Sequence, residues 1–85
     1  MQYKVAWSET FKIQLKKFDK SLAKRIIDKV ESITKDPFKF VKRLKGTDLY
    51  RLRVGDYRVI MSIESGNLII FVLDVGHRKA IYRKY

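Results

Sequence analysis

The fold is decided by residues 44–61, which read LKGTDLYRLRVGDYRVIM. On either side of Gly55-Asp56, apolar and aromatic residues alternate with arginines, the period of two expected of strands that are buried on one face. A two-residue loop that begins with glycine suits a type II′ turn, whose first central residue needs a positive φ. We therefore predict a β-hairpin centred on this turn.

The predicted hairpin gathers arginines on one face. Counting outward from the turn places Arg53 opposite Arg58, with Arg51 on the same side. Like charges directly opposite on a sheet repel, and arginine cannot lose its proton to relieve the repulsion. Planar guanidinium groups match phosphate oxygens, so we interpret the face as anion-binding. The alternative is that the arginines are solvated or paired with acids such as Glu64 or Asp74.

Composition describes one small basic domain, residues 1–85. Twenty Lys and Arg against nine Asp and Glu leave a net charge of +11, which attracts polyanions such as nucleic acid or an acidic protein. With no cysteine, one histidine and no acidic cluster of ligand spacing, we expect no metal and no cofactor. The apolar runs are too short for a membrane span or a signal peptide, so we expect a cytoplasmic protein with no membrane partner.

The remaining elements follow from hydrophobic periodicity and from capping residues. They are a strand at residues 2–7, a helix from Ser8 to near Phe18, a second helix from Asp19 or Ser21 to Asp36-Pro37, an irregular connection at residues 38–45, a turn at residues 65–67, an apolar strand at residues 68–75 and a basic tail at residues 76–85. We predict an α+β fold, with two N-terminal helices packed on one face of a small, mainly antiparallel four-stranded sheet. The arginines then occupy the other face.

The basic tail supplies further candidates for the site. Arg78 and Tyr82 are four residues apart, so they share one side whether the tail is helical or extended. His77 is the one side chain with a reference pKa near neutrality, which makes it a candidate proton carrier. The alternatives are that His77 is an ordinary strand-end residue and that Tyr82 serves only packing.

These residues together match a known family. The pattern Leu44-x-Gly46, Tyr50-Arg51-x-Arg53-x-Gly55-Asp56-Tyr57-Arg58, followed by an apolar strand and Gly76-His77-Arg78 with Tyr82, resembles the RelE/ParE superfamily of toxin-antitoxin toxins. The resemblance covers nearly the whole chain, including its size, basicity and order of elements. It implies the fold of RelE toxins and microbial ribonucleases.

The resemblance also implies an activity and a site. RelE-like toxins are metal-independent endoribonucleases that cut mRNA in the ribosomal A site, by attack of a 2′-hydroxyl on the adjacent phosphate, and so inhibit translation. An acidic RelB-like antitoxin neutralises them, and a toxin-antitoxin heterotetramer is one assembly that the resemblance implies. Carried over to this sequence, the catalytic positions are Arg51, Arg53, Arg58, Arg78 and Tyr82, with His77 as a further candidate.

Two other functions remain open from the sequence. The ParE branch of the superfamily inhibits DNA gyrase and usually lacks the tail tyrosine, so Tyr82 favours RNA cleavage. A basic nucleic-acid-binding domain without catalysis is supported by charge alone. Arg51 and Arg53 stand where the best-known RelE toxins carry lysines, and arginine is a poor general base. The resemblance therefore leaves the proton-transfer roles unassigned.

Overall fold

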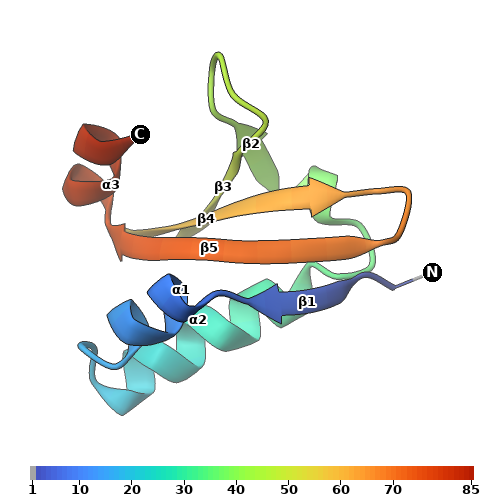
Figure 1. The fold of residues 1–85 in the computed structure, drawn as a ribbon. Helices are drawn as coiled ribbons and strands as arrows, with labels where there is room; N and C mark the ends of the chain where they lie inside the picture. Colours follow the sequence, from blue (N-terminus) through green and yellow to red (C-terminus); the bar gives the residue numbers. More distant parts are fainter. Residues whose placement is uncertain (1) are drawn as a thin grey trace.

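The computed structural model describes residues 2–85 as an α+β fold in which helices pack against a mixed sheet (Figure 1). The elements are β1 (Lys4–Trp7), α1 (Glu9–Leu15), α2 (Lys20–Ser32), the short 3-10 helix η1 (Pro37–Lys39), β2 (Val41–Arg43), β3 (Tyr50–Val54), β4 (Tyr57–Glu64), β5 (Ile69–His77) and α3 (Arg78–Lys84). Over these residues the strands form one five-stranded sheet in the order β1-β5-β4-β3-β2. The predicted fold class is confirmed.

The helices lie on both sides of the sheet, unequally. Figure 1 shows α1 and α2 together along one face, while α3 lies beyond the end of β5, away from α1 and α2. The open part of the second face therefore has β2 and β3 at one edge and α3 at one end. None of the helices in the described chain combines the length and apolarity needed to cross a membrane.

The central hairpin has the register that its turn predicts. β3 and β4 pair antiparallel, with Arg53 opposite Arg58 and Arg51 opposite Ile60. Gly55 has φ +58°, the positive value that the first central residue of a type II′ turn requires. This φ strains any residue with a side chain, whereas the guanidinium group of Arg25, 2.7 Å from a Cβ built on Gly55, is the end of a flexible side chain that could move aside.

The core lies between the sheet and the first two helices. Ser8 and Asp19 cap these helices, since each side chain accepts a hydrogen bond from the backbone N–H of the residue three positions later, at 3.1 and 3.0 Å. The buried side chains are Phe11, Ile26, Val30, Ile33, Leu52, Val54, Val59, Met61, Ile70, Val72 and Val75. Burying each large aliphatic side chain contributes about 1.5–3 kcal/mol relative to leaving it exposed. The arginines of the hairpin alternate with these residues and face the other way.

The sheet is mainly antiparallel, as predicted, and differs from the prediction in the number of its strands. Residues 41–43, expected to be irregular, form β2 on the edge of β3, which raises the count in the described chain from four strands to five. Three residues are too few for an alternation to be recognised. The first strand, β1, pairs parallel with β5, so the sheet is mixed.

Both N-terminal helices end earlier than predicted. α1 ends at Leu15, and Phe18 lies in the turn that follows, with its ring 5.2 Å from that of Tyr57. α2 ends at Ser32 instead of continuing to Asp36-Pro37. The chain leaves the helix there because the carbonyl oxygen of Thr34 accepts a hydrogen bond from the Tyr3 N–H at 2.8 Å, which ties this segment to the start of β1.

Candidate functional site

The face of the hairpin that carries the arginines is hollowed. A cavity of about 360 Å³ lies among β2, β3, β4 and α3, and we call it the arginine hollow. Its lining residues are Phe40, Lys42, Arg51, Arg53, Arg58 and Tyr82. Four cations and one phenol therefore surround a space open to solvent, which is the composition expected of an anion-binding site.

Arg58 is the fixed cation of the arginine hollow. The residue is 8% exposed, and its Nη1 donates to the carbonyl oxygens of Gly55 at 3.0 Å and Tyr57 at 2.9 Å. Those two bonds occupy two of the five N–H groups of a guanidinium. The turn therefore holds Arg58 in place while the rest of its planar group lines the hollow.

Tyr82 lies between two other guanidinium groups. The Cζ atoms of Arg51 and Arg78 lie 5.4 and 5.6 Å from the centre of its ring, within the range of cation–π attraction. Hydrogen bonding to Arg58, together with the charges of Arg51, Arg58 and Arg78, lowers the pKa of Tyr82 against the opposing effect of burial. The residue is 45% exposed and lines the hollow, so a ligand bound there can contact it.

The acids that could have neutralised these arginines have other partners. The Asp74 carboxylate is buried and accepts hydrogen bonds from Lys84 Nζ at 2.8 Å and from the Tyr85 hydroxyl at 3.0 Å. Glu64 accepts from the backbone N–H groups of the turn at residues 66–67. Within residues 2–85, none of the ion pairs closer than 4.0 Å involves the arginines at positions 51, 53, 58 and 78. Pairing with Glu64 or Asp74 is thus excluded, and the positive charge is available to an external anion.

Helix α3 brings the tail residues to the hairpin. The backbone N–H of Arg78 donates to the carbonyl oxygen of Asp56 in the hairpin turn at 2.8 Å. Ile81 is buried, and a Cβ on Gly76 would lie 3.4 Å from its side chain, so the helix packs closely on β5. The far end of α3 is held by Asp74. Arg78 and Tyr82 are placed with the hairpin arginines as a result.

His77 lies elsewhere. It pairs with Tyr57 across β4 and β5, and its ring lies 5.6 Å from the Tyr57 ring, on the face that packs toward Phe18 and the first helices. Its Nδ1 accepts a hydrogen bond from the Lys79 N–H at 3.3 Å, which makes it the N-cap of α3. Although His77 is adjacent to Arg78 in sequence, the structure does not bring it to the arginine hollow.

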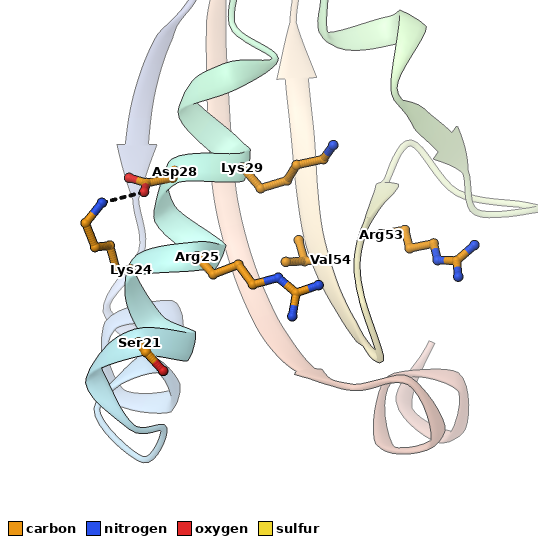
Figure 2. Close-up of a pocket in the computed structure, with 7 residues that line it drawn as sticks. All are labelled: Ser21, Lys24, Arg25, Asp28, Lys29, Arg53 and Val54. Carbon is orange, nitrogen blue, oxygen red and sulfur yellow. Dashed lines mark hydrogen bonds and ion pairs between the residues drawn. The ribbon is translucent and has the colours of Figure 1, made fainter.

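A second, wider recess lies on the other side of Arg53. This recess, the α2–β3 groove, has a volume of about 650 Å³ and lies between α2 and the end of β3 (Figure 2). Its lining residues are Ser21, Lys24, Arg25, Asp28, Lys29, Arg53 and Val54. Arg53 therefore belongs to both recesses.

Sequence reasoning missed two residues of the arginine hollow. Lys42 lies opposite Arg51 in the β2–β3 pairing, and Phe40, 49% exposed, precedes β2. Recognising β2 would have placed Lys42 beside the arginines. Over the described chain, no three or more His, Cys, Asp or Glu side chains gather in a way that could hold a metal ion.

Comparison with known proteins places this arrangement in context. The sequence model of a family described as "ParE toxin of type II toxin-antitoxin system, parDE" matches residues 5–82. No curated protein matches the sequence significantly.

Solved structures of toxin-antitoxin complexes share the fold. RelE of the archaeal RelE–RelB complex from Pyrococcus horikoshii is 33% identical, with a TM-score of 0.77 over 92% of this chain and 97% of that one. The Methanococcus jannaschii RelB–RelE complex contains a chain that is 29% identical, with a TM-score of 0.70 over 93% of this chain and 96% of that one. A chain of the RelBE2 complex from Mycobacterium tuberculosis is 21% identical, with a TM-score of 0.82 over 92% of this chain and all of that one.

Proposed function

This chain belongs to the RelE/ParE superfamily of type II toxin-antitoxin toxins, as the match to the ParE toxin model shows. Starting from that membership, and from the 33% identity to a chain of the RelE–RelB complex, we propose that it is an endoribonuclease that cuts mRNA in the ribosomal A site. The observation that carries the proposal is the arginine hollow, in which uncompensated guanidinium groups surround a tyrosine of lowered pKa. Cations stabilise the negative charge that develops on phosphate, and a phenol can transfer a proton.

In the proposed reaction the 2′-hydroxyl of one nucleotide attacks the adjacent phosphorus. The bond to the 5′-oxygen breaks, which leaves a 2′,3′-cyclic phosphate and a 5′-hydroxyl. Arg58, fixed by the turn, and the more exposed Arg51 and Arg53 stabilise the extra charge on the non-bridging oxygens. Arg78, beside Tyr82, adds to this field from α3.

Proton transfer in this reaction falls to Tyr82. Guanidinium groups keep their protons at physiological pH, so they cannot serve as acid or base. A phenol of lowered pKa is a better acid than free tyrosine, and we assign Tyr82 to protonate the departing 5′-oxygen. The 2′-hydroxyl proton passes to solvent.

The proposed protein partner is an acidic antitoxin. Three of the matched structures are RelE-type chains in complex with RelB-type antitoxins. A net charge of +11 favours an acidic partner here too, because opposite charges accelerate association and favour the bound state.

Primer extension on mRNA translated by purified ribosomes tests the nuclease directly. The wild type should produce cuts that depend on the ribosome, and Tyr82→Phe should reduce the cleavage rate by about 10²- to 10⁴-fold, the usual contribution of general acid catalysis. Tyr3→Phe is the matched control and should cut like the wild type, because Tyr3 precedes β1 and is not among the residues that line the hollow. Undiminished cutting by Tyr82→Phe would remove Tyr82 from the mechanism.

The same assay decides the role of His77. His77→Asn keeps a side chain that can cap α3, because asparagine is a preferred N-cap residue. If His77 acts through that cap, the variant should cut within about threefold of the wild-type rate. A loss of about 10²-fold or more would instead identify His77 as the proton carrier.

A second candidate function is inhibition of DNA gyrase, which the match to the ParE family favours. The two functions separate in one pair of assays. Loss of gyrase supercoiling with intact translated mRNA would establish gyrase as the target and refute the nuclease. Ribosome-dependent cuts together with normal supercoiling would establish the nuclease and refute gyrase as the target.

A further inference from the structure

The α2–β3 groove presents two cations that the arginine hollow does not use. Figure 2 shows Arg25 and Lys29 reaching from α2 toward β3, whereas Lys24 turns away and pairs with Asp28 at 2.7 Å. In the described part of the chain, neither Arg25 nor Lys29 has a carboxylate oxygen within 4.0 Å. The groove is therefore a second place where positive charge is available to an external anion.

The hairpin tip connects this groove to the arginine hollow. From one face, Arg58 donates to the carbonyl oxygen of Gly55 at 3.0 Å. From the other face, Arg25 packs against the same residue, whose Cβ, if present, would lie 2.7 Å from an Arg25 nitrogen. Arg53, at the strand end between them, lines both recesses. Arg25, Arg53 and Arg58 thus lie around the tip of the hairpin.

An exposed aromatic side chain lies at the same boundary. Phe40 lines the arginine hollow, and Lys29 Nζ lies 5.8 Å from the centre of its ring. Cations interleaved with exposed aromatic rings are typical of single-stranded nucleic-acid paths, because phosphates bind the cations and bases stack on the rings.

The groove itself is a poor fit to a protein. Six of its seven lining side chains are polar or charged, and Val54 is the apolar one. Protein interfaces concentrate their binding energy in aromatic and aliphatic anchors, and the residues that line this groove include one aliphatic side chain, Val54, and no aromatic ring. Its charge and composition instead favour a flexible polyanion.

We propose that the α2–β3 groove is a second RNA subsite, which holds the strand flanking the linkage that lies in the arginine hollow. Arg25 and Lys29 bind phosphates there, Arg53 bridges the two subsites, and Phe40 provides a ring for base stacking at the boundary. The identity of the strand rests on the proposed function. A trinucleotide occupies the hollow alone, and only a longer strand reaches the groove.

Binding of uncleavable RNA tests this length dependence. The probes are a trinucleotide and a strand of about twelve nucleotides, both 2′-O-methylated so that no attack can occur, with affinity followed by fluorescence anisotropy over a range of salt. The double variant Arg25→Gln/Lys29→Gln should bind the longer strand about tenfold more weakly, as expected for two exposed ionic interactions. Its salt slope should fall by about 1.4, because each of the two phosphate interactions accounts for about 0.7.

The controls separate this subsite from general charge effects. The double variant should bind the trinucleotide like the wild type. Lys20→Gln, on the same helix but not among the residues that line the groove, should change the affinity for the longer strand by less than about twofold. Unchanged binding of the longer strand by the double variant, or an equal loss on both probes, would overturn the subsite.

Two further outcomes distinguish this inference from its premise. An absence of ribosome-dependent cutting with a retained length-dependent effect would refute the nuclease while supporting the subsite. A double variant that loses affinity for an acidic antitoxin, yet binds the longer RNA normally, would overturn the subsite in favour of a protein-docking groove.

Discussion

At the scale of single residues, the site depends on how differently its arginines are held. Arg58 is buried and bonded to two carbonyl oxygens of the turn, whereas Arg53 lies exposed near the end of β3. A fixed cation stabilises the charge that develops on a ligand without having to move first. An exposed, mobile cation can instead adjust its position as the ligand binds. Tyr82 lies near the fixed cation and receives the summed field of three arginines.

This field predicts an alkaline titration that can be measured. The Tyr82 phenol should titrate below the ordinary tyrosine value of about 10, because Arg58 and its neighbours favour the phenolate. Since the folded pKa lies below the unfolded one, the resulting stabilisation is present above the unfolded pKa and is lost as pH falls through the folded pKa. A pH titration of tyrosinate absorbance, with the curve of Tyr82→Phe subtracted from that of the wild type, measures the titration of Tyr82.

Removing one neighbouring charge should move this titration in a known direction. Arg51→Met takes away a guanidinium 5.4 Å from the ring centre and should raise the pKa of Tyr82. Lys17→Met, which removes an equal charge beyond the end of α1, should leave it in place. A pKa that does not respond to Arg51→Met would show that Arg51 points away from the phenol in solution.

His77 shows that proximity in sequence does not decide the face of the sheet on which a residue lies. Its neighbour Arg78 begins α3 and lies with the arginines, but His77 is the last residue of β5 and follows the alternation of that strand to the opposite face. The sequence placed a strand and a basic tail correctly in order. The sequence contained no signal for the residue at which β5 ends and α3 begins. The position of that junction decides on which face of the sheet His77 lies.

At the scale of elements, α3 depends on its docking. A helix of seven residues is too short to be stable alone, because nucleation is unfavourable and few bonds follow it. Its C-terminal end is held by Lys84 and Tyr85, which both donate to the buried Asp74. The interaction with Asp74 raises the pKa of Lys84, and burial together with Asp74 raises that of Tyr85. Both donors therefore keep their protons at neutral pH and lose them only as pH rises through the raised values.

Releasing this clamp should impair the site without unfolding the core. We expect Lys84→Met/Tyr85→Phe to reduce cleavage by about tenfold to a hundredfold, because α3 would no longer hold Tyr82 against the arginines. The pKa of Tyr82 should rise at the same time. Arg83→Met, on the same turn of the helix, is the matched control and should affect neither quantity. If the double variant keeps both the wild-type rate and the wild-type titration, Asp74 does not position Tyr82.

Longer helices and strands, and those bounded by clear turn or capping residues, could be predicted from the sequence. The hairpin register followed from the glycine turn, and the first two helices followed from caps and apolar stripes. β2 was missed because a three-residue strand has no readable period, and Lys42 was missed with it. The helical tail was left undecided because its seven residues are stabilised by Asp74 and Ile81, through interactions that exist only after folding.

At the scale of the whole molecule, function and stability make opposite demands on charge. A net charge of +11 on 85 residues favours polyanions but destabilises the compact state through self-repulsion. The arginine hollow and the α2–β3 groove concentrate this charge at the hairpin tip. An anion bound there relieves the repulsion, so binding and folding are coupled.

This coupling predicts how the free protein responds to salts. Sodium chloride should raise the melting temperature by screening repulsion, and sodium sulfate at equal ionic strength should raise it further, because a tetrahedral anion fits the arginine hollow as a phosphate would. A sulfate concentration ten times its dissociation constant would add about 1.4 kcal/mol to the free energy of unfolding. Sulfate also stabilises proteins in general by exclusion from their surfaces, so the comparison needs variants of equal charge. The double variant Arg51→Met/Arg53→Met should lose the extra rise in melting temperature that sulfate gives over chloride. The double variant Lys16→Met/Lys17→Met, beyond the end of α1, should keep it. Equal rises in the two variants would mean that the hollow holds no anion.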